Sequence, residues 1–351
     1  MSSIDVKIPV PKVFLAPIPA FSDIGKTAND IINKDFYHNA AAALEVKLKA
    51  PNGVNFTTKG TSPQGDNPIS ASVEGKKALD KGTLNLDLFA AYIPFDLMYS
   101  LPFVIIFNGT PGRLGHSDAF KRVSLKAFLR STGISITQSW NTADVLMTKV
   151  ELANTLANGL KAELTNNFSP SKGSKGQKLS LYFQQPQFHT RAFFDLNAQQ
   201  ALTANVDGVI GYEGFLVGGE AGYDVQKAAI TRYSASVGYS TAQYNAAILA
   251  TNNLSIFSAL YYQKVNSAVE AGVKASYDVK SSSTVGIEVA SKYKIDPLSF
   301  MKAKINDRGI ASLAYNTKVN TGFTFGIGAS FDTQKLNEAG HKIGASFTFE
   351  G

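Results

Sequence analysis

Cysteine is absent from this chain of 351 residues. The absence excludes a disulfide framework, thiolate chemistry and zinc sites with cysteine ligands. The four histidines, His38, His116, His189 and His341, are far apart in the sequence and lack the spacing of a metal site. No serine stands in a GxSxG elbow. We therefore expect no enzyme and no bound cofactor or metal.

Long apolar runs are also scarce, and the mean hydropathy is −0.04. A helical membrane protein would be much more apolar. Only residues 88–107 reach the length of a spanning helix, and this stretch contains Asp96 and two prolines. A spanning helix at residues 88–107 is therefore a disfavoured alternative.

The dominant pattern in the sequence is an alternation with a period of two. In residues 42–50, for example, Leu44, Val46 and Leu48 alternate with charged side chains. Such a segment has one apolar and one polar face, as a strand between lipid and water requires. Roughly nineteen such segments occur, each about as long as a tilted strand that crosses a bilayer. They lie near residues 42–50, 53–60, 69–76, 133–140, 144–153, 158–167, 178–186, 190–198, 200–207, 215–225, 231–240, 243–251, 254–264, 268–278, 284–293, 299–306, 309–317, 322–331 and 341–350.

This alternation predicts an all-β protein, a transmembrane β-barrel of about 19 strands with an aqueous lumen. A soluble β-sandwich or barrel also alternates and is the alternative. Tyrosine and phenylalanine near the segment ends favour the membrane barrel, because such residues gather at membrane interfaces. No basic and then apolar signal peptide opens the chain, which favours a eukaryotic barrel made in the cytosol.

Two regions near the amino terminus depart from the alternation. Residues 1–20 contain four prolines and are expected to be a flexible tail. Residues 21–36 have apolar side chains at helical spacing and predict an amphipathic helix, which Ser22 or Asp23 could cap. In a barrel, the polar lumen is the natural place for this helix. The apolar positions are Phe21, Ile24, Ala28, Ile31 and Ile32.

A third departure spans residues 83–130, which resemble neither a strand nor a polar loop. Removing this stretch would join the third and fourth predicted strands by a short turn. We therefore expect one barrel over residues 42–351 with an atypical insertion at about 83–130. One hypothesis is that the insertion is a retained intron, and a transcript encoding it in frame would refute this.

Residues 293–315 resemble the signature of the mitochondrial porins, also called voltage-dependent anion channels. The matching positions are Tyr293, Asp296, Pro297, Ser299, Ala303, Lys304, Ile305, Asn306, Asp307, Ser312, Leu313 and Tyr315. Residues 21–36 resemble the pore helix of that family, and Gly159-Leu160-Lys161 resembles a triplet linked to nucleotide contact. The resemblance covers residues 20–80 and 131–351 and is closest to fungal porins.

The resemblance implies a voltage-gated, weakly anion-selective channel of the mitochondrial outer membrane. Such a channel passes ATP, ADP, phosphate and other small hydrophilic metabolites by diffusion. The alternative is a protein-conducting import channel of the same membrane. Expected partners are membrane lipid, anionic metabolites, the barrel-assembly machinery during biogenesis and further copies of the chain. No nucleic acid is expected as a partner.

Inward lysines and arginines would supply the selective field of such a pore. The candidates are Lys26, Lys34, Lys47, Lys49, Lys161, Arg191, Arg232, Lys274, Lys302 and Lys304. Opposing carboxylates at Glu163, Asp195 and Glu270 predict modest selectivity. The carboxyl end resembles the sorting signal read by the barrel-assembly machinery, with matches at Lys342, Gly344, Phe347 and Phe349.

Overall fold

The structure is a computed structural model. It describes residues 17–65, 67–79, 82–89, 104–107, 122–129, 133–154, 157–171, 173–197, 199, 201–280, 285–338 and 340–351. Over 82–89, 104–107 and 122–129, and at residue 174, only the backbone is described. The predicted tail at residues 1–16 lies outside the described residues.

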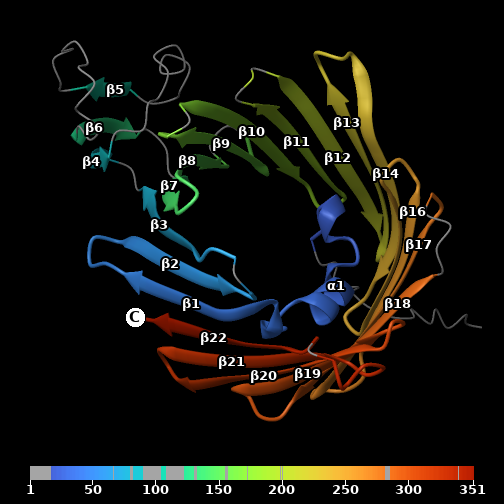
Figure 1. Cartoon of the computed structure of the whole chain (residues 1–351). Coiled ribbons are helices and arrows are strands. Elements are labelled where there is room, and N and C mark those ends of the chain that lie inside the picture. Colours follow the sequence, from blue (N-terminus) through green and yellow to red (C-terminus); the bar gives the residue numbers. More distant parts are fainter. Residues whose placement is uncertain are drawn as a thin grey trace, which may run out of the picture.

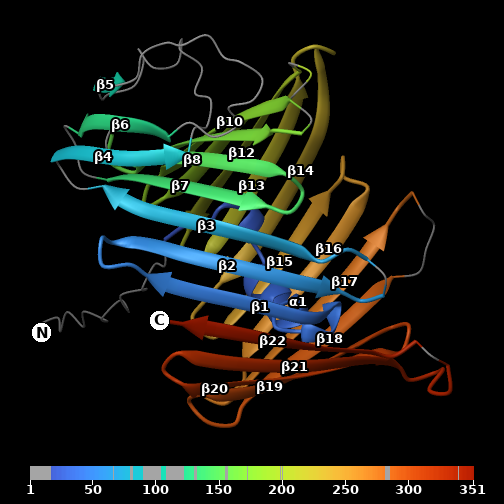
Figure 2. The same ribbon diagram turned by 60° about the vertical axis from the view of Figure 1, so that its left-hand side comes forward.

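Nineteen strands form one closed sheet, which confirms the predicted barrel (Figure 1). Neighbouring strands are antiparallel, except that β1 and β22 run parallel and close the barrel, with Ala42 opposite Ala345. Figure 2 shows the strands inclined around the barrel. The strands are β1 (Ala40–Lys49), β2 (Val54–Pro63), β3 (Ser70–Leu79), β7 (Ile134–Asn141), β8 (Val145–Ala153), β9 (Leu160–Ser169), β10 (Ser174–Gln184), β11 (Phe188–Leu196), β12 (Leu202–Tyr212), β13 (Phe215–Asp224), β14 (Ala229–Ser240), β15 (Tyr244–Thr251), β16 (Ile256–Lys264), β17 (Val269–Asp278), β18 (Gly286–Lys294), β19 (Ser299–Asn306), β20 (Ile310–Asn320), β21 (Phe323–Asp332) and β22 (Lys342–Glu350).

The barrel wall bypasses the stretch predicted to be an insertion, because β3 pairs directly with β7 from Ser72↔Asn141 to Leu79↔Ile134. Between these strands, β4 (Gly82–Phe89), β5 (Val104–Phe107) and β6 (Arg122–Leu129) form a separate three-stranded sheet. The expectation that this stretch contains no strand is therefore wrong. Within the described ranges, no helix has both the length and the apolar character needed to cross a membrane.

Alternation assigns the two faces of the wall, as β17 illustrates. Gly272 faces inward, because a Cβ atom built there would lie 3.2 Å from Cβ of Ile31 in the lumen helix. Val273 therefore faces outward, opposite Tyr261 and Val289, which are 42% and 43% exposed. Large apolar side chains are thus exposed on the outer face, where lipid would surround them.

The amino-terminal helical region is shorter and more broken than the predicted helix over residues 21–36. It consists of η1 (Phe21–Asp23), α1 (Lys26–Asn33) and η2 (Tyr37–Asn39), with α1 inside the barrel (Figure 1). Gly25 separates η1 from α1 and has φ 75°, a left-handed conformation that suits glycine. Gly25 is also the N-cap of α1, and no side chain caps it. The expected caps, Ser22 and Asp23, belong to η1 instead, so that prediction is wrong.

Candidate functional site: the lumen and its helix

The helix α1 lies on one side of the lumen, against β16, β17 and β18. Its apolar face is the predicted one, because Ala28, Ile31 and Ile32 are buried. Ile31 and Ile32 pack with Ala290 and against Tyr262. The small residues Gly272 and Ala290 make room for this close approach, since a side chain at Gly272 would meet Ile31.

A second apolar cluster holds the segment that precedes α1. It contains inward residues from four strands that sequence reasoning did not assign to a helix contact. The members are Ile18, Phe21, Ile24, Ala28, Val209, Leu216, Ala247 and Leu260. Ile18 belongs to the predicted flexible tail, yet it is only 5% exposed, so the described end of that tail is packed.

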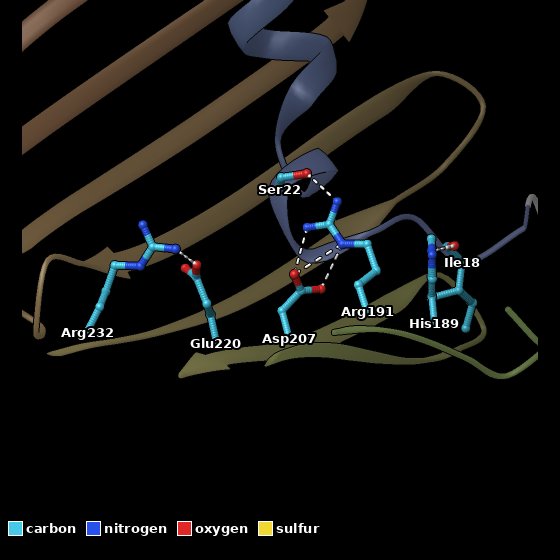
Figure 3. A network of polar contacts seen from close by, with 7 residues as sticks. All are labelled: Ile18, Ser22, His189, Arg191, Asp207, Glu220 and Arg232. Atoms are coloured by element: carbon cyan, nitrogen blue, oxygen red, sulfur yellow. Dashed lines mark hydrogen bonds and ion pairs between the residues drawn. The ribbon is translucent and has the colours of Figure 1, made fainter. Parts of the chain in front are cut away.

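Polar contacts fix the same segment to β10 and β11, and Figure 3 shows those with β11. Arg191 donates to both carboxylate oxygens of Asp207, with its Nη2 2.8 Å from Oδ2, and its Nη1 lies 3.2 Å from Oγ of Ser22. The carbonyl of Ile18 accepts hydrogen bonds from Gln184 Nε2 and from His189 Nδ1, both at 3.2 Å. Arg191 is therefore an anchor for the helix segment as well as a lumen cation.

Lys302 holds the other end of α1. Its amine on β19 lies 3.0 Å from the carbonyl oxygen of Asp30 and 2.6 Å from that of Lys34. The amine is also 3.8 Å from Oδ2 of Asp35 and 5.0 Å from the ring centroid of Phe36. Its side chain is only 1% exposed, so Lys302 does not face the open lumen as the sequence analysis expected.

Glycines of β21 and β22 form a platform, made of Gly326, Gly328 and Gly344, on which η2 lies. A Cβ atom at Gly344 would be 1.9 Å from the carbonyl oxygen of Ala40, and one at Gly326 would be 2.4 Å from the ring of Tyr37. Asn316 donates a hydrogen bond of 2.5 Å to the Tyr37 hydroxyl. Burial raises the pKa of Tyr37 to about 12, so this hydroxyl stays protonated at neutral pH.

Beside the platform, His38 lines a small cavity of about 90 Å³ together with Glu288, Lys304 and Ser312. His38 is 8% exposed, and its Nδ1 has no hydrogen-bond partner within the described part of the chain. Burial, followed by the charges of Lys304 and Lys342, lowers the pKa of His38. His38 is therefore neutral at physiological pH.

The opposite side of the lumen, along β3 and β7 to β10, has a network of charges. Glu151 is central, with Lys149 Nζ 2.6 Å and Lys76 Nζ 3.3 Å from its carboxylate oxygens. Lys161 Nζ lies 2.5 Å from Glu163 and 4.0 Å from Glu151. Lys76, Lys149 and Lys161 are thus each opposed by a carboxylate, which reduces the net field in the pore.

Ion pairs also involve most of the other predicted lumen cations. Their partners are Asp23 for Lys26 at 3.1 Å, Asp30 for Lys34 at 2.8 Å, Glu45 and Glu350 for Lys47 at 3.5 and 3.0 Å, and Glu220 for Arg232. Of the predicted acidic residues, Glu270 pairs with Lys294 at 2.6 Å. Across the described ranges, Lys49, Lys274 and Lys304 form no ion pair within 4.0 Å. The role of these residues in selectivity stays a prediction.

Phe193 is a lumen residue that the sequence analysis missed. It lines a cavity of about 270 Å³ with Lys178, Arg191, Asp195 and Arg232, among others. Lys178 Nζ and Arg191 Cζ lie 5.0 and 5.3 Å from its ring centroid, which is cation–π distance. The signal in the sequence is the pair Phe193-Phe194, since two adjacent aromatic residues on a strand must face opposite sides.

The turn geometry explains the glycine of Gly159-Leu160-Lys161. Gly159 has φ 79°, and a Cβ atom there would lie 2.3 Å from the carbonyl oxygen of Gln184. The turn between β8 and β9 therefore needs this glycine regardless of any ligand. Its predicted contact with nucleotide stays a prediction.

The carboxyl-terminal motif has structural contacts of its own. The rings of Phe347 and Phe325 are 5.4 Å apart, and those of Phe349 and Phe323 are 4.8 Å apart. Gly344 is part of the glycine platform, and Lys342 pairs in register with Ser330. The barrel thus requires Gly344 independently of any sorting role. Searching the described residues finds no group of three or more His, Cys, Asp or Glu residues that could hold a metal ion.

Comparison with known proteins agrees with the barrel architecture described above. The family model described as Eukaryotic porin matches residues 18–91 and 114–344. The chain is 50% identical to the "Mitochondrial outer membrane protein porin" of Neurospora crassa, over 95% of this chain and 99% of that protein. It is 40% identical to the Candida albicans protein of the same name, over 94% and 98%. It is 34% identical to the "Non-selective voltage-gated ion channel 1" of Saccharomyces cerevisiae, over 95% and 99%.

Proposed function

The chain belongs to the eukaryotic porin family, voltage-gated channels of the mitochondrial outer membrane, and we propose that it passes small hydrophilic metabolites with a weak preference for anions. ATP, ADP and phosphate are the main solutes under this proposal. They cross by diffusion, without any covalent step on the protein.

The observation that supports this proposal is the pairing of charge inside the barrel. The whole chain has a net charge of +7, which favours anions. Yet inward cations such as Lys149, Lys161 and Arg191 lie within 3 Å of a carboxylate oxygen. An ion pair acts on a passing solute mainly as a dipole, so the preference for anions is weak.

The position of α1 determines where solutes pass. Because α1 lies against β16 to β18, the free part of the lumen is bounded by the helix and by the opposite strands. A fixed charge acts over about 8 Å at physiological salt. Exposed cations on both sides of this space, such as Lys26 and Lys34 on the helix side and Lys161 on the opposite side, are therefore close enough to act on a solute. Lys161 is the residue we propose for contact with nucleotide phosphate, with Gly159 and Leu160 setting the start of its strand.

The outer surface and the carboxyl end indicate which partners the barrel has besides solutes. The exposed apolar outer face contacts lipid. The motif with Lys342, Gly344, Phe347 and Phe349 is proposed to be read by the barrel-assembly machinery before closure. Self-association of barrels through the outer face is a further part of this proposal.

Recording in a planar bilayer tests the proposed function against protein import. Purified protein is inserted, and the reversal potential is measured under a KCl gradient. A metabolite channel gives a small shift toward the chloride potential and closes at both signs of voltage. A cation preference together with block by positively charged presequence peptides would instead support the import channel. Addition of ATP should reduce conductance less in the variant Lys161→Gln than in the unmodified chain.

A further inference from the structure

Among the described residues of the barrel wall, Lys302 alone makes polar contacts with the carboxyl end of α1. Lys302 reaches in from β19 and donates to two backbone carbonyls, those of Asp30 at 3.0 Å and Lys34 at 2.6 Å. The Asp30 carbonyl also accepts the backbone N–H of Lys34 at 3.1 Å, so Lys302 is a second donor there. Lys34 is the C-cap residue of α1, and the carboxyl end of a helix carries partial negative charge. An ammonium group at this position therefore satisfies both the hydrogen-bonding and the electrostatic requirement of the helix end.

Burial of the amine strengthens the assignment. A lysine is rarely buried unless its charge is paired and hydrogen-bonded, because removal from water is costly. The Lys302 side chain is 1% exposed, with Asp35 at 3.8 Å and the face of Phe36 at 5.0 Å. These contacts all come from the helix end and the segment that follows it. A charge so enclosed contributes little to the field that a solute meets in the lumen.

Lys304, on the same strand, is a matched control for Lys302. It lies two residues further along β19 and on the same face, and its amine is 4.8 Å from the same Phe36 ring. Within the described residues, however, its amine donates no hydrogen bond to a helix carbonyl. Removing either lysine removes one positive charge, but only Lys302 bonds to the end of α1.

We propose that Lys302 is a positioning residue, a C-cap supplied by the barrel wall that keeps α1 seated against β16 to β18. The other end of the segment is held independently through Arg191 with Ser22 and through the Ile18 carbonyl. Loss of Lys302 therefore loosens α1 along its whole contact with β16 to β18, Ala28 included, while the segment before α1 stays attached at Ile18 and Ser22. This proposal concerns the helix position and does not depend on the solutes or selectivity proposed above.

The absence of native cysteine allows a direct test by thiol labelling. Ala28 is 1% exposed in the helix contact, and its neighbour Thr27 is exposed to the lumen. The full-length channel with Ala28→Cys is treated with a hydrophilic maleimide, alone and combined with Lys302→Met or Lys304→Met. We expect Lys302→Met to raise the labelling rate at least about tenfold, because opening of the contact exposes the thiol. Lys304→Met should leave the rate within about twofold of the reference.

Two further measurements separate helix release from general damage. Labelling at Thr27→Cys should be fast in every background, and the β-sheet circular dichroism should match the unmodified chain. In the unmodified chain, acetylation of lysine amines followed by mass spectrometry should modify Lys302 at least about tenfold more slowly than Lys304. Equal labelling of Ala28→Cys in both lysine variants, or equal acetylation of the two lysines, would overturn the proposal. The acetylation result decides the matter even if Lys302→Met fails to fold.

Discussion

The two sides of the lumen are built from the same alternating strands but present different surfaces. On the side that faces α1, inward positions are small or apolar, as at Leu216, Ala247 and Leu260. On the opposite side, inward positions are charged and paired, as in the network around Glu151 and Glu163. Lipid requires apolar side chains on the outer face around the whole barrel, whereas the polarity of the side chains on the inner face changes with what lies against them. Inward positions that the helix segment covers are therefore largely small or apolar, and polar residues there, such as Lys302 and Arg191, hydrogen-bond to that segment.

The largest effect is expected where the helix segment meets the glycine platform. The substitution Gly344→Ala places a Cβ atom 1.9 Å from a backbone oxygen, which the wall can relieve only by displacing η2 or β22. We expect a loss of at least about 3 kcal/mol of stability, or failure to fold. The measurement is thermal unfolding of the refolded channel. The matched control is Gly60→Ala on β2, where a Cβ atom meets nothing within 4 Å.

This result also bears on the proposed sorting signal. A failure of Gly344→Ala to insert would not by itself show recognition by the assembly machinery, because the closed barrel needs this glycine. Phe347→Gln is the cleaner variant for the signal. We expect it to insert poorly into mitochondria while it still refolds in detergent, and normal insertion would refute a signal role.

The next prediction compares arginine substitutions at three kinds of position: facing outward, facing inward and partly exposed to the lumen, and facing inward but buried. Val273→Arg places a charge on the outer face at a cost of about 2–4 kcal/mol near the bilayer midplane. Ser276→Arg, on the opposite face, should be tolerated. Ser276 and Ser330 both face inward and hydrogen-bond to a serine on the next strand, Ser258 at 3.3 Å and Ser312 at 3.1 Å, but Ser330 is buried at 8% exposed whereas Ser276 is only half-buried. We therefore expect Ser330→Arg to destabilise the barrel, unlike Ser276→Arg.

Urea unfolding in lipid vesicles measures all three variants, with Ile327→Arg as a second outward substitution. If Val273→Arg were as harmless as Ser276→Arg, the assignment of the two faces would be off by one residue. If Ser330→Arg were harmless, the cavity beside His38 would be open to the lumen, contrary to the burial seen there.

A smaller effect concerns pH on the covered side. The pKa of His38 is lowered by burial, then by Lys304 and Lys342, so the unfolded chain binds a proton more readily than the folded one. Stability from this residue is present above the unfolded pKa of about 6.5 and is lost as the pH falls below it. We expect the unfolding midpoint to drop between pH 8 and pH 5, and to drop less in His38→Gln. An equal drop in both proteins would mean that other groups control the pH response.

The smallest expected effect is on selectivity. Lys26→Glu or Lys34→Glu should move the reversal potential toward cations more than Lys280→Glu, which lies in an exposed turn after β17. The shift should shrink at 1 M salt, where screening shortens to about 3 Å. Both helix lysines have an aspartate partner, so each reversal adds negative charge beside an existing carboxylate. Equal shifts from all three variants would mean that α1 does not border the narrow part of the pore.

The sequence predicted the strands well because a membrane imposes their pattern. Each of the nineteen predicted segments corresponds to one barrel strand, and residues 299–306 coincide with β19. The helix was predicted too long because Gly25, with its left-handed backbone, divides it. A glycine directly before Lys26 also marks a possible helix start.

The contacts inside the lumen could not be predicted to the same extent. Whether an inward lysine caps a helix, as Lys302 does, depends on the curvature of the barrel and on where α1 rests. Some signal was nevertheless present, since Phe215-Leu216-Val217 and Ala246-Ala247-Ile248 are apolar without interruption. Strands with apolar residues on both faces are covered on both sides. Such runs, on β13 and β15, indicate the wall against which the helix segment packs.

The parallel pairing of β1 with β22 determines which chain features share a side of the membrane. An odd number of strands brings the end of β1 to the end of β22, where Lys49 N–H donates to the Gly351 carbonyl at 3.1 Å. The carboxyl terminus and the turn at residues 50–53 therefore emerge on one side, and the next turn, between β2 and β3, on the other. In intact mitochondria, epitopes placed at Gly351 and at Asn52 should therefore be either both accessible to antibody or both protected. One such pair of tags would establish the sidedness of every turn of the barrel.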